Sequence, residues 1–239
     1  MSLAAKFFRW HRWLGYLVAL QVLAWVMGGL LFSWLPFQAW VKGGDVLNKP
    51  QQALPANWVE SLRTLPPEGE LLGLQSVATA SGPALKLRYA KSEVWLSAAG
   101  GVLPAADAAQ VGDFARSLYK GEGTLVEVKR LSDVPERLVL VRELAGRRDV
   151  WLARFDDSLH SRFYFDGRSG ELLAVRNEAW VIYDFFWRLH LMDYRGGEDF
   201  NNALLRAAAL AALAFTITGL VLSALALRRT WHHWRHKRI

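Results

Sequence analysis

The sequence lacks cysteine throughout its 239 residues. The protein can therefore form no disulfide, no thiolate metal site and none of the thioether bonds that hold haem covalently. The sequence also lacks the motifs Gly-x-Ser-x-Gly, His-Glu-x-x-His and Gly-x-x-x-x-Gly-Lys, which are typical of serine hydrolases, zinc proteases and P-loop nucleotide-binding proteins. We do not expect a self-contained hydrolase.

Charged residues are missing from two long apolar segments near the chain ends. The first extends over residues 13–35 and the second over residues 207–227. As α-helices they would be about 34 and 31 Å long, and the hydrocarbon core of a bilayer is about 30 Å thick. We expect both segments to span a membrane.

A cleaved signal peptide is the alternative for the first segment, because it also combines a basic start with an apolar run. Here the apolar run is longer than in a usual signal peptide, and residues 32–37 contain no small-x-small cleavage site. We therefore expect a retained anchor.

The net charge of +7 comes from the two tails of the chain. Residues 1–12 and 228–239 contain eight basic residues and no acid, which leaves 21 basic and 22 acidic residues between them. Because basic residues beside membrane helices tend to stay in the cytoplasm, we expect both termini inside and residues 37–205 outside. Such tails favour contact with anionic membrane lipid and not with nucleic acid.

The region between the apolar segments changes its periodicity twice. Residues 55–65 and 108–120 have apolar residues at helical spacing, and each is followed by segments with the alternation or the β-branched residues of strands. The expected strands and hairpins lie at residues 85–89, 94–103, 125–128, 138–141, 150–155 and 161–175. This order predicts an α+β membrane protein, in which two transmembrane helices flank two helix-plus-antiparallel-sheet units.

Four segments of the sequence resemble a known family. Residues 163–173 (FYFDGRSGELL) are similar to the strand, acidic turn and strand of PepSY domains, and residues 94–103 (VWLSAAGGVL) are similar to a degenerate copy. Residues 9–16 (RWHRWLGY) and 183–190 (YDFFWRLH) resemble the segments that precede spans in PepSY-associated transmembrane proteins. The common longer members of that family have four spans, whereas two are expected here.

The resemblance, combined with the apolar segments, divides the chain into seven parts. These are a cytoplasmic basic N-terminus (1–12), a first transmembrane helix (13–36), two PepSY-like units (37–106 and 107–177), an interfacial aromatic segment (178–205), a second transmembrane helix (206–227) and a cytoplasmic basic tail (228–239). The aromatic segment is expected at the outer interface because Trp and Tyr favour the boundary between headgroups and acyl chains.

Five of the six histidines flank the apolar segments. The family includes haem-binding reductases, so the resemblance implies haem b as a cofactor and His11 and His190 as candidate ligands of its iron. His232 and His233 are further candidates, because antiparallel spans would bring them to the same cytoplasmic face as His11. Packed or lipid-facing histidines are the alternative at all four positions. Since two spans offer little surface to enclose haem, we expect a homodimer with four helices.

The resemblance implies an electron-transfer or ferric-reductase-like subunit of the bacterial inner membrane. Electrons would pass from the cytoplasmic face through haem to an extracytoplasmic acceptor such as a ferric siderophore. No nicotinamide or flavin site is visible in the sequence, so an electron-donor partner in a membrane complex would be needed. Two alternatives stay open: a PepSY binding module that regulates an exported peptidase through its strand edges, and a structural subunit of an envelope complex.

Overall fold

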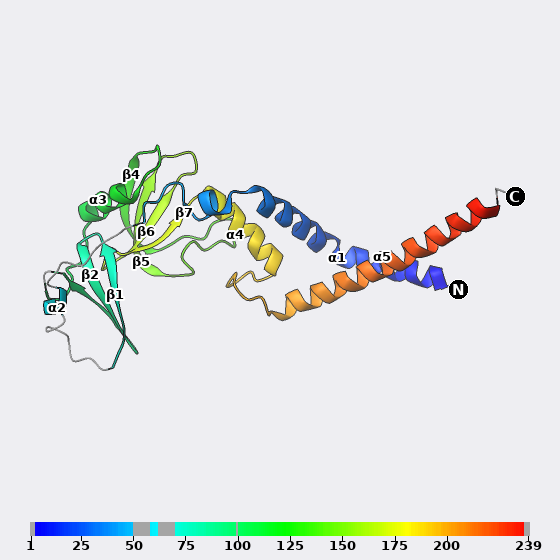
Figure 1. Ribbon diagram of the computed structural model, residues 1–239, viewed down its shortest axis with the longest axis horizontal. Helices are drawn as coiled ribbons and strands as arrows, with labels where there is room; N and C mark the ends of the chain where they lie inside the picture. Colours follow the sequence, from blue (N-terminus) through cyan, green and yellow to red (C-terminus); the bar gives the residue numbers. More distant parts are fainter. Residues whose placement is uncertain (1–2, 50–57, 62–69, 99, 237–239) are drawn as a thin grey trace. The chain divides into compact units, whose positions relative to one another are not determined.

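A computed structural model describes residues 3–49, 58–61, 70–98 and 100–236 of the chain (Figure 1). The chain divides into two compact units. We call Met1–Trp34 together with Asp184–Ile239 the helical unit, and Leu35–Tyr183 the sheet unit. The helix α4 (Glu178–Leu191) contributes to both, because the boundary falls within it.

The helical unit is built on two long helices, α1 (Leu3–Trp34) and α5 (Ala203–His236). Among the described residues these are the two helices that are long and apolar enough to cross a membrane, over Ala5–Trp34 and Ala203–Trp231. Both apolar segments predicted from the sequence lie almost entirely within them. The helices also continue into the basic tails.

Local sequence determines where α1 ends and where α5 begins. α1 stops shortly before Pro36, whose ring disfavours helical geometry in the residue that precedes it. α5 begins after Asn202, whose side-chain oxygen accepts a hydrogen bond of 2.8 Å from the backbone N–H of Leu205. This bond satisfies one of the free N–H groups of the first turn.

The described part of the sheet unit contains two antiparallel sheets, in which neighbouring strands follow one another along the chain. The first consists of β1 (Leu71–Thr79), β2 (Gly82–Tyr89) and β3 (Glu93–Ser97), and the second of β4 (Leu125–Asp133), β5 (Arg148–Phe155), β6 (Arg162–Asp166) and β7 (Leu172–Arg176). The helical segments of the unit include η1 (Phe37–Val41), a single π-helical turn, α2 (Trp58–Ser61) and α3 (Ala108–Leu118). The prediction of terminal apolar helices and central antiparallel sheets is confirmed. The assignment of each sheet as a PepSY-like unit stays a prediction.

The helix α3 covers one face of the second sheet (Figure 1). It begins with a capping box, in which the carboxylate of Asp107 accepts a hydrogen bond of 2.8 Å from the backbone N–H of Gln110. Its apolar face packs against aromatic residues of β5 and β6. This core contains Val111, Ala115, Leu118, Phe155, Phe163 and Phe165.

The other face of the second sheet is covered by the loop between β4 and β5. Val134 and Leu144 of this loop pack against Val150, Leu152 and Tyr164 of the sheet. One face of the sheet therefore packs against α3 and the other packs against this loop.

Residues 138–141, which the sequence predicts as a strand, belong to this loop. They form a turn that is closed by a bridge between Arg137 and Val141. The prediction was wrong because Leu138 and Val139 have positive φ angles, outside the β region, and the chain reverses there. Of the predicted helix at residues 55–65, only Trp58–Ser61 lies within the described residues.

The turn between β6 and β7 joins the two sheets. The carbonyl of Gly170 accepts a hydrogen bond of 3.1 Å from the N–H of Ala80, which follows β1. The carboxylate of Glu171 lies 3.1 Å from the indole nitrogen of Trp95 and 3.3 Å from the Lys86 ammonium, both on the first sheet. The segment that resembles a PepSY motif is thus the joint between the sheets.

An aspartate shapes this joint. The carboxylate of Asp166 accepts hydrogen bonds from the backbone N–H groups of Arg168 (3.0 Å) and Ser169 (2.8 Å). Burial alone would raise the pKa of Asp166, but these hydrogen bonds outweigh it and hold the pKa below its usual value. The carboxylate therefore stays ionised and keeps the turn closed.

Candidate functional site

His11 of α1 lies against α5. Its Nδ1 atom is 3.1 Å from the carbonyl oxygen of Phe215 and 3.0 Å from the hydroxyl oxygen of Thr218. The Thr218 hydroxyl itself donates to the same carbonyl, at 2.8 Å. A carbonyl oxygen can only accept, so Nδ1 is the nitrogen placed to donate, and the tautomer that does so has its lone pair on Nε2. Metal-bound histidines have this arrangement, with one nitrogen donating to the protein and the other on the metal.

The space for the His11 ring comes from a glycine. The imidazole stacks on Phe215, with ring centroids 4.2 Å apart. A Cβ atom added to Gly219 would lie 3.0 Å from Cε1 of His11. One turn away, a Cβ atom added to Gly15 would lie 3.2 Å from the Phe215 ring. Small residues on both helices thus let α1 and α5 approach closely enough to enclose the two rings.

His190 lies in the last turn of α4. Rings of Trp25, Phe32 and Trp187 surround it, each with its centroid 6.2 Å from that of the imidazole. Its Nδ1 atom is buried and has no hydrogen-bond partner in the part of the chain that the structure describes. Buried polar atoms without a partner are uncommon. Nδ1 of His190 is therefore available to a ligand or to a group of another molecule.

The C-terminal end of α4 is capped by side chains of α1 and of the residue that precedes α5. Gln21 donates from its amide to the carbonyl of Leu189, and Trp25 donates from its indole N–H to the carbonyl of His190, both at 2.9 Å. The carbonyl of Leu191 accepts from the Asn202 amide at 2.9 Å. The last carbonyls of a helix have no partner within it, and leaving them bare in an apolar environment costs several kcal/mol. Side chains from α1 and from the start of α5 therefore fix the position of His190.

Replacing Gln21 by leucine is expected to destabilise the helical unit, although it makes α1 more apolar. The substitution leaves the carbonyl of Leu189 without its donor, at a cost of about 1 to 2 kcal/mol. Thermal unfolding of the detergent-solubilised chain measures the effect. Thr216→Val is the matched control, because the Thr216 hydroxyl bonds the Ala212 carbonyl of its own helix; a variant Gln21→Leu as stable as this control would contradict the capping role.

The structure keeps the predicted ligands apart. Fourteen positions of α1 separate His11 from Trp25, the neighbour of His190, which is about 21 Å along the helix axis. The contact of His11 at Gly219 lies thirteen positions before His232, about 20 Å along α5. The side chains of His232 and His233 lie outside the described residues. Over the described ranges there is no group of three or more His, Asp or Glu side chains that could hold a metal ion.

An ion pair and a polar loop lie next to His190. Arg188 is bonded to Asp184 within α4, at 2.6 Å, and both side chains are largely buried. The loop that follows folds around Asp193, whose carboxylate accepts hydrogen bonds from the backbone N–H groups of residues 195–199. These bonds hold the pKa of Asp193 well below its ordinary value. The connection between α4 and α5 is therefore ordered by one aspartate.

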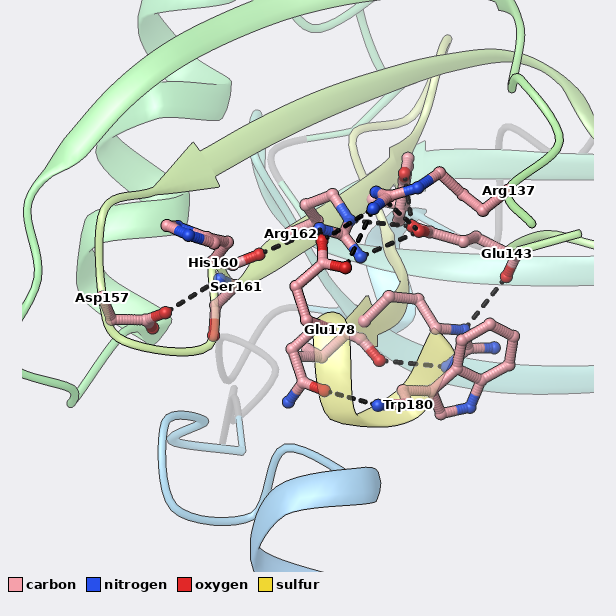
Figure 2. Close-up of polar contacts among 12 residues, drawn as sticks. Arg137, Glu143, Asp157, His160, Ser161, Arg162, Glu178 and Trp180 are labelled. Atoms are coloured by element: carbon pink, nitrogen blue, oxygen red, sulfur yellow. Dashed lines mark hydrogen bonds and ion pairs between the residues drawn. The ribbon is translucent and has the colours of Figure 1, made fainter. Parts of the chain in front are cut away.

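A second cluster of charged residues lies in the sheet unit (Figure 2). The carboxylate of Glu143 pairs with the guanidinium of Arg162 at 2.8 Å, and these side chains are only 2% and 7% exposed. The hydroxyl of Tyr164 donates to the same carboxylate at 2.7 Å. Glu178, the first residue of α4, pairs with Arg162 at 2.7 Å and with Arg137 at 2.8 Å. We call these five residues the charge cluster.

The charge cluster holds its members in defined ionisation states. Burial alone would lower the pKa of Arg162, but the carboxylates of Glu143 and Glu178 outweigh it and raise the pKa. Burial would raise the pKa of Glu178, but its bonds with Arg162 and Arg137 lower it. Burial and the Glu143 carboxylate together raise the pKa of Tyr164 well above its ordinary value. The cluster therefore fixes the start of α4 to β6 with paired charges.

The charge cluster was not predicted from the sequence. Its members come from a loop, a strand and a helix, and they are spread over residues 137–178. One signal could have pointed to it. Arg162 and Tyr164 alternate with Phe163 and Phe165, so a polar face of β6 stands opposite the apolar face that packs under α3.

Comparison with known proteins gives one match. The family model described as the PepSY-associated TM region matches residues 8–239. Among curated proteins and among solved structures, none matches the chain significantly. The matched range includes α1 from residue 8 onward, the whole of α5, both sheets and the charge cluster.

Proposed function

Because the chain belongs to the family of the PepSY-associated TM region, we propose that this membrane protein is a b-type haem-binding subunit that transfers electrons. The observation that carries the proposal is the placement of His11, whose Nδ1 lies 3.1 Å from the carbonyl oxygen of Phe215 and 3.0 Å from the hydroxyl oxygen of Thr218, so that Nε2 is the ring nitrogen left for iron. The unpartnered Nδ1 of His190 supports a second site. Haem, when bound, would supply the one-electron chemistry.

The residues of the chain would hold and orient this group. His11 would offer Nε2 from a slot between α1 and α5. His190 would offer a ring nitrogen inside an aromatic pocket. About 21 Å of α1 separates His11 from Trp25, the neighbour of His190. The two histidines would therefore bind haem at different depths in the membrane. Contacts with Phe215 and Thr218 would hold the ring of His11. Gln21 and Trp25 donate to the backbone carbonyls of Leu189 and His190 and would hold the end of α4 that carries the second ring.

A second copy of the chain would complete each site. One helical unit offers one histidine at each level, and a haem with two axial ligands needs two. A symmetric homodimer would place the same histidine of each copy opposite the other. Gly29 of α1 favours such an approach, because a Cβ atom added there would meet no described atom within 4 Å.

The direction of transfer follows from the proposed topology. With both basic tails in the cytoplasm of a bacterium, His11 would lie toward the inner face and the sheet unit would lie outside. Electrons would come from a partner on the inner side and leave toward an extracytoplasmic acceptor such as a ferric siderophore. His232 and His233 would contribute only if the tail of α5 turns toward the cytoplasmic face of this site.

Haem content tests the proposal. The full chain, expressed with ample haem supply and purified in mild detergent, is expected to show a reduced-minus-oxidised b-type spectrum. His11→Ala and His190→Ala are each expected to lose the haem of one level and to keep that of the other. His160→Ala is the control, since His160 is exposed in a turn of the sheet unit. Wild-type protein without haem, or haem unchanged in both variants, would contradict the proposal.

A second candidate function is a binding module for an exported protein, such as a peptidase that it regulates. The edge strand β1 favours it, because Leu71, Leu72 and Leu74 are exposed and β2 is its strand neighbour among the described residues. An extended peptide could add to such an edge through backbone hydrogen bonds. Haem-free protein that still forms a complex through β1 would favour this function.

A further inference from the structure

The turn at residues 138–140 has a backbone that its residues do not favour. Two hydrogen bonds between Arg137 and Val141, of 2.9 and 2.8 Å, close it. Leu138 and Val139 both adopt positive φ angles, of 48° and 67°. Glycine, asparagine and aspartate occupy this left-handed region readily, whereas a β-branched residue such as valine rarely does.

The apolar side chains of the turn are exposed to solvent over much of their surface. Leu138 is 53% exposed and Val139 is 85% exposed, although the neighbouring Val141 is fully buried. An apolar pair on a strained tip costs conformational energy and leaves apolar surface in water. In a protein selected for stability alone, Asn-Gly would serve this position better. The exposed Leu138 and Val139 side chains therefore favour an apolar partner that is not part of the sheet unit.

The turn lies at the end of the sheet unit where the chain enters and leaves it. Arg137, at the base of the turn, is paired with Glu178 at the start of α4 (Figure 2). The residue before Glu178, Asn177, donates from its amide to the carbonyl of Trp40 in η1, at 2.6 Å. η1 follows α1, and α4 leads toward α5. Further exposed apolar residues lie on these two segments, namely Phe37, Trp40 and Ile182.

We propose that Leu138 and Val139 insert into the interfacial region of the lipid bilayer. The segments η1 and α4 are joined in the chain to α1 and α5, which are long and apolar enough to span a membrane, and this continuity of the chain favours lipid as the apolar partner. Trp40 has the amphipathic character of a side chain at the headgroup boundary. Lys42, which follows η1 and is exposed, can approach lipid phosphates while the apolar tip enters the acyl region. This proposal does not depend on haem.

The absence of cysteine makes the test direct. A single Cys at position 139 (Val139→Cys) or position 138 (Leu138→Cys) carries an environment-sensitive fluorophore on the full chain, reconstituted in vesicles of phosphatidylethanolamine and phosphatidylglycerol. We expect blue-shifted emission, quenching by lipids that carry a quencher on the acyl chain, and protection from aqueous iodide. Val102→Cys is the control, because Val102 is similarly exposed but follows β3 of the other sheet; its label should show the reverse pattern.

A further variant separates lipid contact from the affinity of the fluorophore itself. Val139→Asn, made in the labelled Leu138→Cys chain, suits the positive φ angle and removes the apolar tip. We expect the label at position 138 to become accessible to iodide while the sheet unit keeps its stability. If iodide quenched the label at position 139 as strongly as the label at position 102, the proposal would be overturned. A tip that binds another protein would give this result, because the vesicles contain no such partner. The proposal would also be overturned if Val139→Asn left the iodide accessibility of the label at position 138 unchanged.

Discussion

Replacing Arg162 by methionine is expected to lower the free energy of unfolding of the sheet unit by about 3 to 5 kcal/mol, because it leaves the Glu143 carboxylate buried without its cation. The side chain of Glu143 is almost completely inaccessible to solvent, so water cannot replace the lost partner. Methionine fills most of the space of the arginine stem, which limits the contribution of a cavity. The start of α4 also loses one of the two arginines that hold Glu178.

Amide hydrogen exchange of peptides from β5 and β6, in the full chain in detergent, measures this loss locally. The matched control is Arg130→Met, since Arg130 pairs with Asp149 at 2.7 Å on the surface, where such pairs contribute about 0 to 1 kcal/mol. Adding Glu143→Gln to Arg162→Met removes the stranded charge and should recover part of the stability. Equal effects of the Arg162 and Arg130 variants would show that burial of the cluster does not matter.

Replacing Gly170 by alanine is expected to loosen the joint between the two sheets. Gly170 has a φ angle of +68°, and an added Cβ atom would lie 2.6 Å from Cβ of Ala80 and 2.9 Å from Cβ of Ala106. Left-handed strain and overpacking together should cost about 2 to 5 kcal/mol. The bond from Ala80 N–H to the Gly170 carbonyl would be the first to lengthen.

Gly146→Ala separates the two causes. Gly146 also has a positive φ angle, of 80°, but a Cβ atom there would meet nothing within 4 Å among the described atoms, so its cost should be strain alone, about 1 to 2 kcal/mol. Faster exchange of the amides at the end of β1 and in β7 is expected for Gly170→Ala and not for Gly146→Ala. If the two variants behaved alike, the close approach of the sheets would have no energetic role.

Local patterns in the sequence predicted the elements that depend on local chemistry. An unbroken uncharged run is sufficient for a long apolar helix, and both such runs became helices. The helix α3 was predicted from the spacing of Val111, Ala115 and Leu118, which the structure buries. The hairpin of β6 and β7 was predicted from its Gly-Arg-Ser-Gly turn. In each case neighbours in the chain determine the outcome.

Features that depend on distant partners were not predictable in this way. β1 was missed because Gly73 and Gln75 interrupt its pattern, and its pairing with β2 compensates for them. Residues 138–141 have strand composition, but Leu138 and Val139 adopt positive φ angles and the chain closes a turn through the bridge between Arg137 and Val141. Hydropathy defines the length of two antiparallel spans but not their register, so the sequence did not predict that His11 contacts Phe215 and Thr218 in the middle of α5.

The slot of His11 makes positions 11 and 219 a coupled pair in evolution. The imidazole occupies the volume that any side chain at Gly219 would need. A larger residue at position 219 is compatible with the fold only after the ring at position 11 has become smaller or has moved. In descendants of this chain the two positions should therefore change together, and a lineage that loses this histidine first becomes free to lose the glycine.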